Sequence, residues 1–122
     1  MLAVSKKGTL LATGSANGTV IRVFYTRTRQ QISELRRGSD PCNLYCLRFA
    51  PCSSLLSVTS DKGTVHVFAV RENQEVDGWT NRKNIFDDTK RSIAQFTLPA
   101  AHAEGTIRCA FIEDPSGAKS EC

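Results

Sequence analysis

Hydrophobic and polar residues alternate in two stretches of the chain that resemble each other. Residues 10–24 read LLATGSANGTVIRVF, and residues 55–68 read LLSVTSDKGTVHVF. In each stretch a β-rich run leads into a turn signal, ANG or DKG, and an alternating run follows. Each stretch is therefore predicted to form a β-hairpin. The first copy has one extra residue after its valine, which is compatible with a β-bulge.

Two further runs extend each hairpin to a unit of four strands. LYCLRFAP, at 44–51, predicts a strand that ends in a proline turn, with Leu44, Cys46, Leu47 and Phe49 on its core side. ISELRRG, at 32–38, predicts a short outer strand. A four-strand unit that repeats at about 40 to 45 residues has the spacing of β-propeller blades. No window shows a sustained helical period, which argues against a helical repeat.

The chain is therefore predicted to be all-β, a WD40-like β-propeller fragment with about two blades and the start of a third. The expected units are residues 1–38, 39–99 and 100–122, with the opening residues entering mid-blade and TIRCAFIED, at 106–114, starting the last unit. Two blades cannot close a ring and would leave unpaired strand edges, so the chain is expected to be part of a longer protein.

A polar stretch interrupts the second unit. Residues 71–92 are too long for an ordinary hairpin loop, and we expect them to form an insertion between its third and fourth strands. The run SIAQFTLP, at 92–99, then predicts the fourth strand.

Positive charge is concentrated in one short segment. The formal net charge is only +4, but five arginines fall within residues 22–37: Arg22, Arg27, Arg29, Arg36 and Arg37. Glu34 is the one acidic residue among them. Such a local positive field favours a polyanion, a phosphorylated headgroup or an acidic surface. A solvated strand edge with no ligand is the alternative.

The segment Leu35-Arg36-Arg37-Gly38, framed by the two hairpins, resembles the Phe/Leu-Arg-Arg-Gly motif of the WIPI proteins. These form the PROPPIN family of phosphoinositide-binding β-propellers in autophagy. The resemblance extends from residue 2 to about residue 112. It implies a seven-bladed propeller, of which this chain would supply roughly the fifth and sixth blades and the start of the seventh. It also implies binding of phosphatidylinositol 3-phosphate and 3,5-bisphosphate at two shallow rim sites, one on each side of the double arginine.

The arginine pair suits this arrangement because successive strand residues point to opposite faces. One guanidinium can then serve each site, and its planar donors bind phosphate oxygens bidentately. The expected first site is Arg36 with Ser15, Thr19 and Arg22, and the second is Arg37 with Ser60, Lys62, Thr64 and His66. Ser39 is expected to complete either one.

These residues also have purely structural interpretations. Ser15 and Ser60 could cap their turns, Thr19 and Thr64 could be ordinary β-formers, and Arg22 could be a solvated strand residue. His66 stands where the first hairpin has Arg22, so the second site is expected to be less cationic at neutral pH and to gain charge as the pH falls.

The insertion is the candidate for a second membrane anchor. The resemblance implies that this loop enters the membrane, because the matching loop of the family does so. Trp79, Ile85 and Phe86 are the residues expected to enter it. Its basic residues, Arg82, Lys83, Lys90 and Arg91, would then meet anionic lipid. Five acidic residues oppose this: Glu72, Glu75, Asp77, Asp87 and Asp88. A mobile surface loop is the alternative.

We therefore predict a peripheral membrane adaptor that binds phosphatidylinositol 3-phosphate or 3,5-bisphosphate and acts with autophagy proteins in autophagosome formation. The resemblance implies a cytoplasmic localisation, peripherally on phagophore and endosomal membranes. No apolar stretch approaches membrane-spanning length, so any membrane contact is expected to be peripheral. The alternative function is a propeller scaffold that binds acidic protein partners without recognising lipid.

Other classes of function find little support in the sequence. It has no nucleophile–base pair at usable spacing, no glycine loop that would cradle phosphate, and no metal-ligand spacing among its five cysteines and two histidines, so neither an enzyme nor a cofactor or metal is expected. Aromatic platforms beside the arginines are missing, which argues against nucleic acid. Cys46 and Cys109 lie in apolar runs and are expected to be small core residues.

Overall fold

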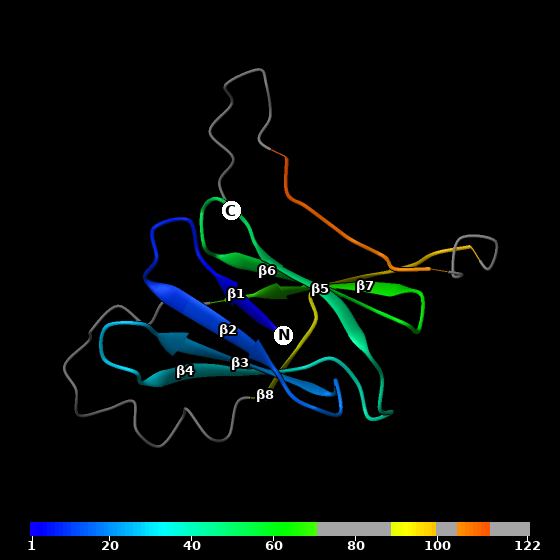
Figure 1. Ribbon diagram of the computed structural model, residues 1–122, viewed down its shortest axis with the longest axis horizontal. Coiled ribbons are helices and arrows are strands. Elements are labelled where there is room, and N and C mark those ends of the chain that lie inside the picture. Colours follow the sequence, from blue (N-terminus) through cyan, green and yellow to red (C-terminus); the bar gives the residue numbers. More distant parts are fainter. Residues whose placement is uncertain (71–88, 100–104, 113–122) are drawn as a thin grey trace.

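The computed structural model describes residues 1–70, 89–99 and 105–112, which contain nine β-strands and no helix. Figure 1 shows the strands gathered in two sheets that lie against each other. The strands are β1 (Leu2–Val4), β2 (Leu10–Gly14), β3 (Val20–Tyr25), β4 (Gln31–Arg36), β5 (Leu44–Phe49), β6 (Leu55–Ser60), β7 (Thr64–Ala69), β8 (Thr89–Arg91) and β9 (Ala94–Thr97). The all-β prediction is confirmed.

The first sheet has the order β1-β2-β3-β4-β8, and its first four strands are antiparallel. The short strand β1 pairs with β2, with Leu2 opposite Thr13 and Val4 opposite Leu11. The expectation that the chain enters mid-blade is therefore wrong, because β1 gives the first sheet the same four antiparallel strands as the second. β1 has only three residues, and Ala3 is the one that is partly buried, so its alternation is too short to be recognised as a strand in the sequence.

The extra residue of the first hairpin lengthens its turn and forms no bulge. Gly14 lies opposite Ile21, and the backbone N–H of Ser15 donates to the carbonyl of Val20 at 2.9 Å, so the turn spans residues 16–19. In the second hairpin Thr59 lies opposite Val65, which leaves residues 61–63 in the turn. The register shift of the first sheet lies elsewhere, between β3 and β4, near Val23 and Phe24.

The second sheet has the order β5-β6-β7-β9, all antiparallel. Side chains of β5 alternate between its two faces. Leu47 joins the core between the sheets, while Cys46 lies on the opposite face, where its thiol contacts that of Cys109 at 3.8 Å. The prediction that Leu44, Cys46, Leu47 and Phe49 share one core side is thus wrong, because both faces of the sheet are covered.

The core lies between the two sheets. Its centre consists of fully buried aliphatic and aromatic side chains from both hairpins: Leu10, Ala12, Ile21, Val23, Leu35, Leu56, Val58 and Phe68. The two sheets approach each other where β1 and β2 lie against β5. Burial of apolar surface on this scale is what holds two otherwise separate sheets together.

The last strand of the first sheet comes from a distant part of the chain. β8 pairs with β4 in parallel, with Glu34 opposite Thr89 and Arg36 opposite Arg91, and β9 then joins the second sheet. The predicted insertion at 71–92 therefore contains a strand near its end. The sequence TKR gives no hydrophobic signal for it, because an edge strand is held by backbone hydrogen bonds to its neighbour. Residues 71–88 lie outside the described part of the chain.

Residues 105–112 pack on the outer face of the second sheet without forming a strand there. The hydroxyl of Thr59 donates to the carbonyl of Ile107 at 2.6 Å, and the thiol of Cys109 lies 3.0 Å from the hydroxyl of Ser57. Burial beside these groups raises the pKa of Cys109. The start of the third unit was predicted in these residues, at 106–114. Across the described residues, no helix is long and apolar enough to cross a membrane.

Candidate functional site

The double arginine stands at the end of β4, and the strand register assigns its two residues to opposite faces of the first sheet. Leu35 lies opposite Ile21 and is fully buried towards the core. Arg36 lies opposite Val20 and is exposed. Arg37 continues the ladder, since its backbone N–H donates to the carbonyl of Thr19 at 2.9 Å. Because side chains alternate along a strand, Arg37 returns to the face that the second sheet covers.

The outer face of the first sheet carries the expected first site. Arg22 and Arg36 both point to it, because Arg22 lies two residues from Val20 in β3 and Arg36 is the register partner of Val20. Arg22 is not free: its Nε lies 3.6 Å from a carboxylate oxygen of Glu34. Arg36 makes no hydrogen bond or ion pair with any residue that the structure describes. None of the described residues therefore occupies the donors of Arg36, which can bind an anion.

Ser15 and Thr19 belong to the turn that borders this face. The hydroxyl of Ser15 accepts a hydrogen bond from the backbone N–H of Val20 at 3.2 Å, which is the capping role expected as the alternative. Thr19 lies within the longer turn and is half-buried. The structure thus brings Ser15, Arg22 and Arg36 to the edge of the outer face of the first sheet. The hydroxyl of Ser15 caps the turn there.

Arg37 is held by backbone carbonyls. Its Nε donates to the carbonyl of Gly18 at 2.7 Å, and an Nη2 hydrogen is donated to the carbonyl of Asp40. A guanidinium carries five N–H donors, so three remain for a ligand. The carbonyl of Gly18 is presented by a turn that only glycine suits, because its φ is +69° and an added Cβ would meet the carbonyl oxygen of Cys42 at 2.3 Å. Sequence reasoning assigned Arg37 to a ligand and missed this second role.

His66 is buried on the face that the first sheet covers. Its Nε2 lies 3.3 Å from the hydroxyl of Thr64 and its Nδ1 lies 3.3 Å from that of Ser92, while its ring stacks on Phe68 with centroids 6.2 Å apart. Burial, and secondarily the positive charge of Arg37, lower the pKa of His66 below its ordinary value. The imidazole is therefore neutral at pH 7, and it takes up a proton only at a lower pH than a free histidine.

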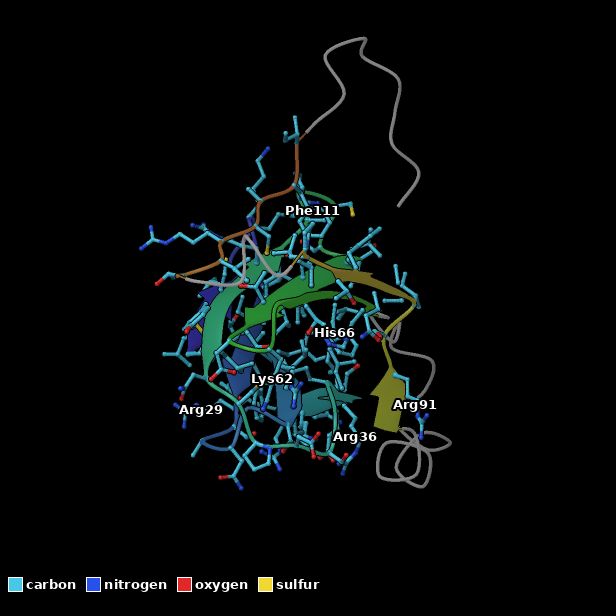
Figure 2. All side chains as sticks on the ribbon, turned by 90° about the vertical axis from the view of Figure 1, so that its right-hand side faces the viewer. Arg29, Arg36, Lys62, His66, Arg91 and Phe111 are labelled. Carbon is cyan, nitrogen blue, oxygen red and sulfur yellow. The ribbon has the colours of Figure 1, made fainter. Side chains whose placement is uncertain are left out.

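The remaining candidates of the second site differ in their exposure. Ser60 is fully buried and its hydroxyl accepts from the backbone N–H of Lys62 at 3.3 Å, which again is a capping role. The side chain of Lys62 is exposed, as is that of Ser39. The structure therefore brings Arg37, Thr64 and His66 to one place between the sheets. Lys62 lies on the turn before β7, below His66 in the view of Figure 2.

Sequence reasoning missed two placements in this region. Ser92 carried no signal, and it reaches His66 from the segment between β8 and β9, which is far from the second hairpin along the chain. Arg91 was expected only to meet anionic lipid, and it lies beside Arg36 through the parallel pairing of β8 with β4. The three residues predicted to enter the membrane, Trp79, Ile85 and Phe86, lie outside the described part of the chain.

Residues 30–68, which include the double arginine and the second hairpin, match the WD40 family, described as WD domain, G-beta repeat. Autophagy-related protein 18 of Schizosaccharomyces pombe is 49% identical over 71 residues, which are 58% of this chain and 19% of that protein. SVP1-like protein 2 of Kluyveromyces lactis is 35% identical over 119 residues, 93% of this chain and 34% of that protein.

Solved structures agree with these relatives. A structure of Kluyveromyces lactis Hsv2, with complete loop 6CD, superimposes with a TM-score of 0.78 at 35% identity and covers 93% of this chain and 36% of that one. The homologues of this chain are PROPPIN β-propellers. A further match, at 36% identity and a TM-score of 0.54 over 60% of this chain and 24% of that one, is titled as the complex of KlAtg21 with the coiled coil of AgAtg16.

These findings confirm the resemblance to PROPPIN proteins and the WD40-like propeller fold. They also connect the chain to autophagy-related proteins. The chain spans about a fifth to a third of the length of the relatives and structures just described.

Proposed function

We propose that this PROPPIN chain forms the phosphoinositide-reading part of a peripheral membrane adaptor in autophagosome formation. The ligands are phosphatidylinositol 3-phosphate and phosphatidylinositol 3,5-bisphosphate. The observation that carries the proposal is the opposite placement of Arg36 and Arg37 at the end of β4. Arg36 lies on the outer face, opposite Val20 of the first hairpin, and Arg37 lies on the inner side, near His66 of the second.

The chemistry of the two sides suits phosphate. On the outer face, Arg36 is exposed and has no partner among the described residues, so it is ready to bind an anion at little desolvation cost. On the inner side, Arg37 is already oriented by two carbonyls, which lowers the entropy lost when its remaining donors bind phosphate. The hydroxyl groups of Thr64 and Ser92 are close to this side as well, because each contacts a ring nitrogen of His66.

The neutral His66 makes the second side the weaker of the two at pH 7. A buried imidazole that is not protonated contributes no charge, and both ring nitrogens of His66 already have hydrogen-bond partners in Thr64 and Ser92. The second side therefore depends on Arg37 and on the exposed Lys62 for its positive field.

Membrane attachment in this proposal uses more than one contact. A single shallow headgroup site binds weakly, and two sites on one rigid body raise the effective affinity of the pair. The segment with Trp79, Ile85 and Phe86 is the proposed additional anchor at the phagophore or endosomal membrane. Autophagy proteins are the proposed protein partners, a view supported by the Atg18 homologue and by the complex with a coiled coil.

Vesicle sedimentation tests the proposal. The protein is incubated with phosphatidylcholine vesicles that contain or lack phosphatidylinositol 3-phosphate, and the double substitution Arg36→Thr and Arg37→Thr is compared with wild type. We expect wild type to sediment only with the phosphoinositide and the double variant to remain in solution. Arg29→Gln is the matched control, because this exposed arginine lies on the turn at the other end of β4.

The rival function predicts a different result. If the chain is a scaffold for acidic protein partners, sedimentation is independent of the phosphoinositide and the double substitution leaves it unchanged. That result would exclude the proposed lipid recognition while leaving the propeller assignment intact.

A further inference from the structure

The parallel pairing of β8 with β4 sets two arginines side by side. Arg36 and Arg91 are register partners in this ladder. Partners in a ladder point to the same face of a sheet, and neighbouring strands lie roughly 4.8 Å apart. Both side chains are exposed, and Figure 2 shows them near each other on one side of the molecule. Arg36 thus has a neighbour that the Arg-Arg-Gly motif itself does not contain.

Like charges directly opposite each other in a sheet are destabilising unless something neutralises them. Glu34, the described carboxylate on this face, is already paired with Arg22. Neither Arg36 nor Arg91 makes a hydrogen bond or an ion pair with any residue that the structure describes. The pair therefore forms a concentrated positive charge at the rim of the first sheet, with donors directed outwards.

We propose that Arg91 is a specificity-determining residue of the Arg36 side, and that the Arg36–Arg91 pair favours a headgroup with two ring phosphates over a headgroup with one. Two guanidinium forks on adjacent strands offer bidentate contacts to two separate phosphates. A headgroup with one ring phosphate gives the second fork no ring phosphate of its own, so it gains less from the pair. This inference rests on the proposed function and assigns a preference to one of its two sites.

The placement of Arg91 makes this preference separable from binding itself. Arg36 stands at the end of β4, and the preceding residue of that strand, Leu35, is fully buried in the core. Arg91 lies on the short edge strand β8, which reaches the site from a different part of the chain. Removal of the Arg91 guanidinium therefore leaves Arg36 and the hairpin in place and removes one fork.

Affinity measurements with two lipids test the inference. The protein is titrated with phosphatidylcholine vesicles that contain either phosphatidylinositol 3-phosphate or phosphatidylinositol 3,5-bisphosphate. We expect Arg91→Gln to weaken binding to the bisphosphate by about fivefold and binding to the monophosphate by less than about twofold. Arg36→Thr is expected to weaken both. Arg29→Gln removes the same charge from the opposite end of β4 and is expected to leave both affinities unchanged.

Two further arms keep the result interpretable. Arg91→Lys keeps the charge and loses the fork, so it is expected to lower the preference for the bisphosphate to an intermediate value. Competition with soluble inositol 1,3,5-trisphosphate separates headgroup recognition from attraction to a charged surface. Circular dichroism of each variant verifies that the strands are retained.

The outcomes distinguish this inference from the proposed function. If wild type binds neither lipid, the proposed function fails and the inference fails with it. If wild type binds and Arg36→Thr weakens binding, but Arg91→Gln behaves like Arg29→Gln, the function stands and the inference is overturned. Three other results also overturn the inference. Arg91→Gln could weaken binding to both lipids equally, or Arg91→Lys could leave the selectivity unchanged. The selectivity seen with vesicles could also be absent in competition with the soluble headgroup.

Discussion

The two hairpins repeat one sequence pattern and yet present different surfaces. In the first, Arg22 is exposed on the outer face and is paired with Glu34. In the second, His66 takes the equivalent place, and it is buried, stacked on Phe68 and hydrogen-bonded on both ring nitrogens. The hairpins share a fold because they share an alternation of hydrophobic residues. Their chemistry differs because an arginine paired with Glu34 stands in one, and a histidine enclosed by Thr64, Ser92 and Phe68 stands in the other.

The turns extend this contrast. The first turn has one more residue, and its Gly18 carbonyl receives the Nε of Arg37. The second turn is shorter, and its Ser60 hydroxyl caps the backbone of Lys62. The first turn thus supplies an acceptor to the second arginine of the motif. The comparison indicates that the first hairpin orients Arg37, the arginine that the proposed function assigns to the second site.

The largest expected effect comes from the first turn. Gly18→Ala combines a φ of +69° with a clash against the backbone of Cys42, so we expect it to lower the free energy of unfolding by about 3 kcal/mol. Gly8→Ala is the matched control, because Gly8 has a φ of +73° and open space around its Cβ. Its expected cost is about 1 kcal/mol. Urea denaturation measures both, and equal losses would contradict the role given to the Gly18–Cys42 contact.

The next effect separates the two arginines. Arg37→Thr removes two hydrogen bonds to carbonyls, so we expect it to lower the free energy of unfolding by about 1 to 2 kcal/mol in addition to weakening lipid binding. Arg36→Thr removes no such bond within the described residues and is expected to weaken lipid binding at unchanged stability. Thermal melts of the two variants without lipid test this difference. Equal melting temperatures would mean that the carbonyl contacts of Arg37 do not stabilise the turn.

A smaller effect concerns pH. Since the pKa of His66 is lowered in the folded chain, the unfolded chain takes up a proton at a higher pH than the folded chain does. Stability is therefore fully present above about pH 6.5, the ordinary value, and is lost as the pH falls through the folded pKa. His66→Gln is expected to flatten this dependence between about pH 7.5 and about pH 5.5.

If His66→Gln and wild type lose the same stability on acidification, then the pKa of His66 is not lowered in the folded chain.

The sequence was sufficient for the features that follow from local patterns. The alternation in TVIRVF and TVHVF predicted β3 and β7, and the position of the arginines in a strand predicted that Arg36 and Arg37 would diverge. It was insufficient where long-range contacts decide. β8 has no hydrophobic residue and exists only because β4 offers it an edge, and Ser92 reaches His66 only because the chain passes from one sheet to the other.

Local chemistry also left open which role a residue takes. Serine at a turn suits both capping and a phosphate contact, and only the 3.2 Å bond from Val20 to Ser15 reveals that capping occupies it. The burial of His66 was equally hidden, because alternation assigns a residue to a face and does not state what covers that face.

The smallest expected effect tests the ion pair that distinguishes the first hairpin. The Arg22–Glu34 contact is partly exposed and 3.6 Å long, so its removal by Glu34→Gln is expected to change the free energy of unfolding by less than about 0.5 kcal/mol. The same change frees Arg22 beside Arg36 and is expected to strengthen phosphoinositide binding by about twofold, because a competing carboxylate is removed. The gain should disappear at high salt, which screens exposed charges. Vesicle titrations at two salt concentrations measure it, and weaker binding in the variant would show that Glu34 positions Arg22 for the ligand.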